Sequence, residues 1–391
     1  MLEARRWRQF DMVMVVTAVF IVLYGIAMIH SATCGSGCVT WSPGDEGKRH
    51  PTGIQFFPPS DFALRQAAFA PLGLALMLAV AAVDFRVIRA LAYPTYGVSI
   101  LFLGAVLVFG RGEVEYGARR WIDLGLFEFQ PSEVARVALV LALARWLSSH
   151  EAQRLSSRRL VGSLLFAAVP ALMVFKQPDL GTAVGFMVIW FGMLIAAGAR
   201  PRQLGAVLAS TLAAAPIFWI LLLDYQRQRL ATFFRVLADP ESDIFGEGYN
   251  ILQARISIGS GGMGGRGFGL GEQTQFDYLL VKHNDFIFSV LAEEMGFRGA
   301  IILLALLILL LLRIIRAADR AGEPYGRLLT YGIACMLLFQ TVVNLGANLT
   351  LLPVTGIPLP LVSYGRSALL ANFAALGLVQ GVLMRRPKYR Y

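Results

Sequence analysis

A single carboxylate stands where a polar segment meets a long apolar run. Asp285 follows Lys282, His283 and Asn284, and Phe286 comes directly after it. The carboxylate could be the N-cap of the helix that the apolar run forms. It could equally be a group that aromatic neighbours partly desolvate and that accepts a proton. The spacing leaves both readings open, so Asp285 is a candidate general base with His283 close by.

A second charged pair lies inside an apolar run. Pro131 suits the first turn of a helix, and Glu133 and Arg136 then fall three positions apart on one helix face. Ionisable residues within a membrane are costly and usually face a cavity or a partner. The pair could simply join two helices as an ion pair. We favour the interpretation that it supports a site.

Basic residues also occur in the polar segments between apolar runs. Arginine matches phosphate through its bidentate geometry, although each of these side chains taken alone is read more simply as a solvated surface charge. Asp179, three residues after Lys176, is a further candidate supporting residue, and it is also well placed as a helix N-cap. The candidate anion-binding residues are Arg119, Arg120, Lys176, Arg227, Arg229 and Arg255.

Glycine dominates residues 259–271, which read GSGGMGGRGFGLG and include eight glycines. The segment formally matches the GxGxxG dinucleotide fingerprint, but that fingerprint requires a strand, a turn and a helix in a soluble βαβ unit. The sequence predicts no such unit here. A flexible hinge and a close approach of backbone amides to a phosphate both stay open, and we favour the hinge.

The elements that carry these residues belong to a membrane protein. Of 391 residues, 57% are hydrophobic and 15% are charged, whereas soluble domains carry about 25% charged residues. A helix crosses the membrane with about 20 apolar residues and satisfies its own backbone in lipid. We therefore predict an all-α integral membrane protein forming one polytopic domain over residues 1–391. Its ten predicted spans lie near 10–31, 62–83, 88–110, 131–149, 159–175, 181–198, 202–223, 285–312, 326–352 and 366–384.

Arginine and lysine indicate how the bundle is oriented. Both termini and every second loop are basic, which places them in the cytoplasm. An even number of spans agrees with this orientation. The net charge of +10 is then a topology signal, and no basic face is left over to predict nucleic-acid binding.

Polar segments collect on the opposite, extracytoplasmic side. The loop at 224–284 between the seventh and eighth spans is the one extended hydrophilic segment, and loops this long are usually functional or disordered. Residues 352–365 contain three prolines, which forbid regular helix. Such backbone survives at membrane depth only when it lines a cavity or is buried in protein. The sequence thus predicts a site on the outer face. Cys34 and Cys38 also lie there, as a disulfide or as two free thiols.

At these motifs the chain resembles the SEDS family (RodA, FtsW and SpoVE). The resemblance covers almost the whole sequence, and its motifs follow the family's order. They are the Ser31-Ala32-Thr33 end of the first span, GARRW at 117–121, QPSE at 130–133, QPDLGTA at 177–183, YQRQR at 225–229, GYN at 248–250, DFIFSVLAEEMGF at 285–297 and LPVTGIPLPLVSYG at 352–365.

The resemblance implies a peptidoglycan glycosyltransferase on the outer face of a bacterial cytoplasmic membrane. Such an enzyme joins lipid II into glycan strands and releases undecaprenyl pyrophosphate. The family's essential loop aspartate matches Asp285, and its Glu and Lys pair matches Glu133 and Arg136, where arginine replaces lysine. The Ser-Tyr motif places Ser363 at the site. Arg366, a departure from the family pattern, could contact pyrophosphate or be solvated.

We expect Asp285 to take the proton of the acceptor hydroxyl and the basic residues to stabilise the leaving pyrophosphate. A divalent cation, Mg or Mn, could share that work, with Asp285 and Glu133 as conceivable ligands, although no closed metal site is visible in the sequence. The main alternative is a transporter that flips lipid II. The polar residues cluster at the outer end rather than at the midplane, which argues against it. A scaffold with no chemistry of its own is a third reading.

The resemblance also implies partners. Members of the family work with a single-span class B penicillin-binding transpeptidase and with other membrane proteins of the elongation or division complex. The segment 353–360 and the short tails look more like the elongation (RodA) branch than the division (FtsW) branch. One sequence does not separate the two roles.

Overall fold

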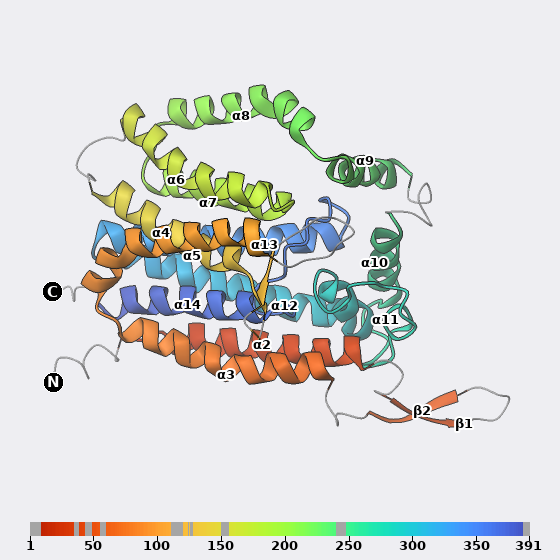
Figure 1. Ribbon diagram of the computed structural model, residues 1–391. Helices are drawn as coiled ribbons and strands as arrows, with labels where there is room; N and C mark the ends of the chain where they lie inside the picture. Colours follow the sequence, from red (N-terminus) through yellow and green to blue (C-terminus); the bar gives the residue numbers. More distant parts are fainter. Residues whose placement is uncertain are drawn as a thin grey trace.

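The computed structural model describes residues 9–34, 39–43, 49–54, 60–110, 120–123, 125, 128–149, 156–239 and 248–385. Within these residues the chain is almost entirely helical, and most helices lie side by side along one direction (Figure 1). The helices of the first half are α2 (Met12–Thr33), α3 (Asp61–Ala82), α4 (Phe85–Phe109), α5 (Pro131–Ser148), α6 (Ser157–Phe175), α7 (Leu180–Ala196) and α8 (Pro201–Leu221). The second half contains α9 (Asp224–Ala238), α10 (Tyr249–Ser260), α11 (Glu272–Gln275), α12 (Ile287–Asp319), α13 (Pro324–Asn348) and α14 (Arg366–Leu383).

A helix occupies each of the ten predicted spans, which confirms the all-α class. Eight helices are long and apolar enough to cross a membrane. The other two are α7, with 17 residues, and α5, which carries Glu133, Arg136 and Arg145. That these two also cross stays a prediction, and so does the total of ten spans. Helix α13 ends at Asn348, within the predicted span at 326–352.

Two antiparallel strand pairs complete the described elements. Strand β1 (Val39–Pro43) pairs with β2 (Arg49–Ile54), and β3 (Ile122–Asp123) pairs with β4 (Glu128–Phe129). The first hairpin lies at the same end of the bundle as α9, α10 and α11 (Figure 1). Cys34, just before that hairpin, is disulfide-bonded. Cys38 lies outside the described residues, so the predicted Cys34–Cys38 pairing stays open.

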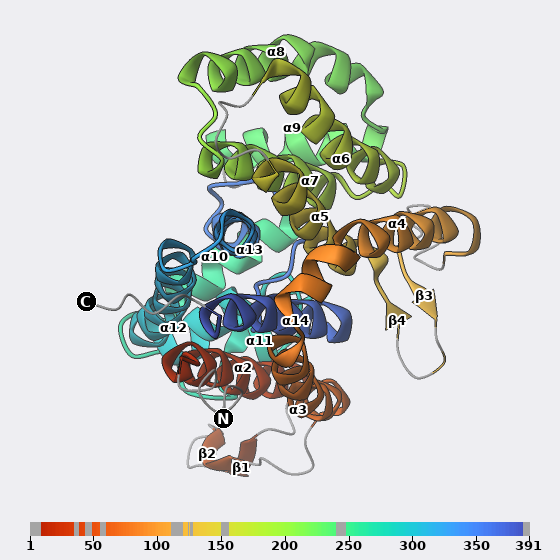
Figure 2. The ribbon, with the colours of Figure 1, turned by 90° about the vertical axis from the view of Figure 1, so that its left-hand side faces the viewer.

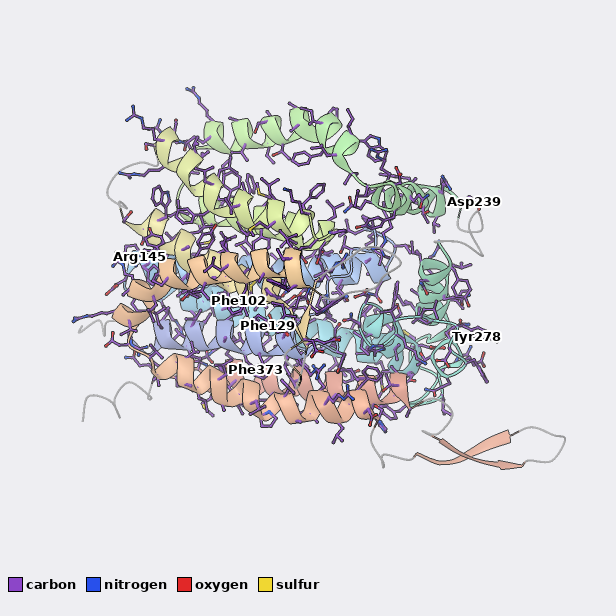
Figure 3. The ribbon with its side chains drawn as sticks, viewed as in Figure 1. Phe102, Phe129, Arg145, Asp239, Tyr278 and Phe373 are labelled. Carbon is purple, nitrogen blue, oxygen red and sulfur yellow. The ribbon has the colours of Figure 1, made fainter. Side chains whose placement is uncertain are left out.

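Small residues let the central helices pack closely, as is common between membrane helices. A Cβ on Gly377 of α14 would lie 2.5 Å from the backbone oxygen of Met77 in α3. One on Gly73 of α3 would lie 2.3 Å from the ring of Phe373, which sits in the middle of the bundle (Figure 3). Helix α8 behaves differently: none of its residues is buried, and it stands apart from the other helices (Figures 1 and 2).

Hydrogen bonds show which helix ends share each side of the bundle. At one end, the backbone of Asp11 bonds to Gln380, and Arg385 donates to the carbonyls of Ala82 and Val83 that end α3. Arg145 lies at this end and Tyr278 at the other (Figure 3). The start of α2 therefore shares one end of the bundle with the C-terminal ends of α3, α5 and α14, as the predicted topology requires. The segment 224–284 lies at the second end.

The segment predicted as an extended hydrophilic loop, 224–284, contains three helices among its described residues. Helix α9 has Arg227 and Arg235 on its polar side, whereas α10 packs against α12. The glycine-rich stretch connects α10 to α11. What looked like a loop in the sequence is therefore an ordered cap on one end of the bundle.

Candidate functional site

Asp285 presents a carboxylate that accepts no hydrogen bond from the described part of the chain. Its side chain is half-buried, and Oδ1 is shielded from solvent without a hydrogen-bond partner. The N-cap of α12 is Phe286, and no side chain caps that helix end. Of the two readings of Asp285, the N-cap is therefore wrong. A half-buried carboxylate without partners is free to bind something else.

The surroundings of Asp285 keep its carboxylate protonatable near neutral pH. Burial raises the pKa of Asp285 from 3.8 to about 6. The positive charges of Arg229 and Arg120 oppose this shift, while the negative charge of Asp179 adds to it. A group with this pKa accepts a proton readily and releases it again at cellular pH.

A cleft opens beside Asp285. It has a cavity volume of about 50 Å³ and is lined by the start of α7, by α9 and by the loop after α13. Arg120, Tyr225 and Arg229 supply its polar lining, and Pro353–Thr355 form another wall. The next loop residue is Gly356, where a Cβ would lie 3.9 Å from Asp285 Oδ2. The two cations of the cleft lining thus come near the unsatisfied carboxylate, which lies against the loop residue that follows this wall.

One backbone carbonyl positions the polar lining of the cleft. The oxygen of Pro178 accepts hydrogen bonds from the guanidinium of Arg120 and from the hydroxyl of Tyr225, at 2.7 Å. Arg120 also reaches the carbonyl of Gln177, and the guanidinium of Arg229 lies 5.8 Å from the ring centre of Tyr225. Asp179, the next residue, is the N-cap of α7 and accepts from the Thr182 amide at 3.0 Å, as predicted. The turn at residues 177–179 thereby holds Arg120 and orients Tyr225. Arg229 in turn lies over the ring of Tyr225.

The loop after α13 holds the segment that ends in Asp285. Ser363 donates from Oγ to the carbonyl of Asn284 at 2.7 Å, and the amide of Tyr364 donates to the carbonyl of His283 at 3.0 Å. The imidazole lies against Phe62, with ring centres 4.6 Å apart. Burial lowers the pKa of His283, and the charge of Lys282 lowers it further. Neutral His283 therefore has a packing role in this structure.

Glu133 and Arg136 form a separate buried cluster. Their side chains pair directly within α5, and both are almost fully buried. With its amide oxygen turned toward the guanidinium, Gln340 of α13 accepts from two nitrogens of Arg136, at 2.6 and 3.0 Å. A lysine could not make this forked contact, so arginine at position 136 joins α5 to α13 as well as neutralising Glu133.

The other predicted anion-binding residues have different places. The guanidinium of Arg227 bonds the carbonyls of Trp219 and Ile220, so it caps α8 rather than facing the cleft. Lys176 and Arg255 are exposed, and neither lines the cleft. Arg119 lies outside the described residues. Arg366 lies over the ring of Phe69, 5.9 Å from its centre.

The glycine-rich segment packs against a kink in α12. The helix breaks at Gly296, whose φ is +64°, and a Cβ there would lie 2.3 Å from the amide nitrogen of Gly265. The amides of Arg266 and Gly267 donate to the carbonyls of Glu293 and Glu294, both at 2.9 Å. Close packing against α12 accounts for Gly261 and Gly265, and a positive φ accounts for Gly262, Gly267 and Gly269. The hinge stays a prediction. The dinucleotide reading fails here too, because α10 and not a strand precedes the segment.

Three residues of the site were not selected as candidates from the sequence. Tyr225 lines the cleft, and Asn344 and Asn348 donate from their amides to the carbonyl of Asp285, at 3.0 and 2.9 Å. The two asparagines could have been found, because polar amides at i and i+4 in an apolar helix lie on one face. For the metal prediction, the described residues contain no group of three or more His, Cys, Asp or Glu side chains that could hold an ion.

Comparison with known proteins gives one consistent result. The family model for FtsW, RodA and SpoVE, described as "Cell cycle protein", matches residues 11–388. The chain is 41% identical to the peptidoglycan glycosyltransferase MrdB of Escherichia coli K12, over 81% of this chain and 84% of MrdB. It is 33% identical to the probable peptidoglycan glycosyltransferase FtsW of Geobacter sulfurreducens, with 98% of each chain covered.

Solved structures show the same likeness. One is a chain from a study of the structural coordination of polymerization and crosslinking by a peptidoglycan synthase complex. It aligns with a TM-score of 0.77 and 34% identity, over 96% of this chain and 97% of that one. The rod shape determining protein RodA of Thermus thermophilus aligns with a TM-score of 0.68 and 32% identity, over 98% of both chains.

Proposed function

This chain belongs to the FtsW, RodA and SpoVE family of cell cycle proteins, and from that premise we propose that it polymerises lipid II into peptidoglycan glycan strands. Two relatives bear the name peptidoglycan glycosyltransferase. The observation that carries the proposal is the unsatisfied carboxylate of Asp285 beside a cleft lined by Arg120 and Arg229. A base and two cations side by side suit a sugar transfer that releases a pyrophosphate.

Asp285 acts as the general base. The 4-hydroxyl of the acceptor sugar attacks the anomeric carbon of the donor, a new carbon–oxygen bond forms, and the bond to the lipid pyrophosphate breaks. The hydroxyl proton passes to Asp285. Its pKa of about 6 leaves most of the carboxylate ionised at neutral pH, and positioned bases of this kind contribute about 10²–10⁴-fold to a rate.

Arg229 and Arg120 stabilise the negative charge that builds on the leaving pyrophosphate. Arg229 is exposed at the cleft, so two N–H groups of its guanidinium are available to donate to two phosphate oxygens. Arg120 is partly committed to the carbonyls of Gln177 and Pro178, which fix its position. Arg229 therefore makes the larger share of direct phosphate contact.

A divalent cation held jointly by Asp285 and Glu133 does not fit the geometry well. The carboxylate of Glu133 is paired with Arg136, and those residues form a cluster of their own with Gln340. No step of the proposed mechanism is routed through a metal. A requirement for Mg or Mn remains a prediction that rates with and without chelator would check.

The protein is a multi-pass membrane protein. We place it in the bacterial cytoplasmic membrane, with both termini inside and the cleft on the outer face, because the basic loops and the cleft lie at opposite ends. Its partner in this proposal is a class B transpeptidase, which would cross-link the strands as they leave the cleft. The similar peptidoglycan synthase complex, described as coordinating polymerization and crosslinking, supports such a partner.

The test is polymerisation of labelled lipid II by the purified protein with its transpeptidase. The variants are Asp285→Asn and Asp239→Asn, the latter an exposed aspartate at the end of α9 (Figure 3). We expect long glycan chains from the wild type and from Asp239→Asn, and almost none from Asp285→Asn. Equal chains from all three proteins would remove Asp285 from the mechanism. No chains from any of them, together with lipid II translocation in liposomes, would favour a transporter.

A further inference from the structure

Helix α13 carries three buried amides on one face. Gln340, Asn344 and Asn348 are spaced four residues apart, and all three are at most 2% exposed. Residues at this spacing point to the same side of a helix. Buried amides in a spanning helix are costly unless each finds partners, so this row must bond to specific groups.

The partners of two of these amides converge on Asp285. Asn348 donates from Nδ2 to the carbonyl of Asp285 at 2.9 Å, and Asn344 donates to the same oxygen at 3.0 Å. Asn344 also donates to the carbonyl of Ile357 at 3.0 Å. One backbone oxygen thus takes two side-chain donors, and one of those donors also holds the loop that follows the cleft wall at Pro353–Thr355.

Ser289 sets the orientation of the Asn348 amide. Its backbone N–H and its hydroxyl both reach Asn348 Oδ1, at 3.2 and 2.7 Å. Because a backbone N–H can only donate, the oxygen of the amide must face Ser289 and its nitrogen must face Asp285. The side-chain amide of Asn348 therefore has one fixed orientation, with its nitrogen donating to the carbonyl of Asp285.

The two preceding carbonyls are captured as well. Those of His283 and Asn284 accept from the Tyr364 amide and the Ser363 hydroxyl. Three successive carbonyls are thereby held by other elements, while the carboxyl oxygen Oδ1 of Asp285 has no partner. The protein immobilises the backbone of this residue and leaves its reactive group unoccupied.

We propose that Asn344 and Asn348 are positioning residues for the transfer reaction: their amides clamp the carbonyl of Asp285 so that its carboxylate points at the acceptor hydroxyl. This rests on the proposed function, since it needs Asp285 to be the base. Asn344 and Asn348 touch neither substrate nor the reacting atoms. Their effect is expected on the rate of the chemical step, because misplacing a reacting group by about 1 Å can cost about 100-fold.

The test compares Asn344→Ala and Asn348→Ala with Asn372→Ala and Asp285→Asn in lipid II polymerisation. Asn372 is a buried asparagine of α14, 2% exposed, whose Oδ1 has no hydrogen-bond partner among the described residues. We expect kcat to fall about 10- to 100-fold in the two clamp variants with KM for lipid II within about twofold, and Asn372→Ala to match the wild type. The acidic limb of the pH–rate profile should also move to lower pH. Without the clamp, the carboxylate of Asp285 becomes more exposed to solvent, and its pKa falls.

Ser289→Ala keeps the proposal testable if the asparagine variants fail to fold. It removes one donor that orients Asn348 with little change in volume, and it should lower kcat several-fold with the same shift in pH profile. Wild-type kcat in the clamp variants would overturn the clamp, as would losses equal to that of Asn372→Ala with an unchanged pH profile. No glycan from the wild type, or full activity of Asp285→Asn, would instead overturn the function from which the clamp was inferred.

Discussion

Burial shapes the chemistry of Asp285 more than the charges near it do. Arg229 and Arg120 both lower the pKa of Asp285, yet desolvation still raises it to about 6. An ordinary surface aspartate would be ionised but a weak base. The site instead holds a stronger base that still carries its charge at neutral pH.

We expect the polymerisation rate to rise with pH through about 6 and then level off. Below that pKa the carboxylate is protonated and cannot accept the acceptor proton, so the rate should fall about tenfold per pH unit. Replacing Arg229 by Gln removes a charge that lowers the pKa of Asp285, so the limb should move to higher pH. Initial rates between about pH 5 and about pH 8 measure this. Arg235→Gln, an exposed arginine elsewhere on α9, serves as the control, and an equal shift in that variant would contradict the assignment.

Arg136 illustrates a different use of charge. Its guanidinium is buried with Glu133 and reaches Gln340 on another helix. Arg136→Ala should cost about 3–5 kcal/mol because it strands a buried carboxylate, whereas Arg136→Lys keeps the pair and should cost about 1 kcal/mol for the lost fork. Glu133→Leu combined with Arg136→Met should recover most of the loss. Unfolding in detergent measures all three. Equal losses in Arg136→Ala and Arg136→Lys would show that the charge pair contributes little.

At the scale of elements, the break in α12 organises the end of the bundle that carries the cleft. Gly296 interrupts the helix, and the carboxylate of Glu293 then accepts from the Gln273 amide and the Thr274 hydroxyl, both at 2.8 Å. The carbonyl of Thr274 in turn accepts from Lys282 at 2.6 Å. Hydrogen bonds therefore connect the kinked part of α12 to α11, and α11 to the segment that ends in Asp285.

Two neighbouring glycines provide a matched test of that packing. A Cβ on Gly261 would lie 1.9 Å from the carbonyl oxygen of Ala292, whereas a Cβ on Gly259 meets nothing within 4 Å. Gly261→Ala should push α10 away from α12 and lower both stability and activity. Gly259→Ala lies within a helix and should be neutral or stabilising by up to about 1 kcal/mol. Thermal unfolding and polymerisation assays check both, and similar behaviour of the two variants would refute the close packing.

At the scale of the whole molecule, the two ends of the helix bundle differ in what they contain. One end is fastened by arginines that bond helix termini: Arg313 pairs with Asp11 at 2.7 Å, and Arg145 donates to the carbonyls of Arg89 and Ala90. The other end carries α9 to α11 and the β1–β2 hairpin (Figure 1), and α9 lines the cleft. A membrane between these ends would keep substrate and cytoplasm apart.

Cysteine labelling tests this orientation. With the three native cysteines replaced by serine, Met263→Cys should react with an impermeant maleimide in intact spheroplasts, because Met263 is 63% exposed at the cleft end. Arg202→Cys, at the start of α8, should react only after the membrane is permeabilised. The opposite pattern would invert the topology and place the cleft in the cytoplasm.

The sequence by itself determined the fold class and the positions of the long helices, and it selected several residues that lie at the cleft end. Hydrophobic runs and basic loops follow from the cost of placing charge and unpaired backbone in lipid, and that cost acts locally along the chain. Asp285, Arg120, Arg229 and Ser363 were all chosen from motifs. Arg227 was chosen in the same way, although its guanidinium bonds the end of α8.

Only the tertiary structure decided what each of these side chains contacts. The N-cap and free-carboxylate readings of Asp285 share one sequence and differ only in the partners that folding supplies. The approach of Asn344 and Asn348 to that residue spans about sixty positions of the chain, and no local pattern encodes it. Hydrogen bonds and desolvation depend on distances between elements, and those distances exist only after the helices have packed.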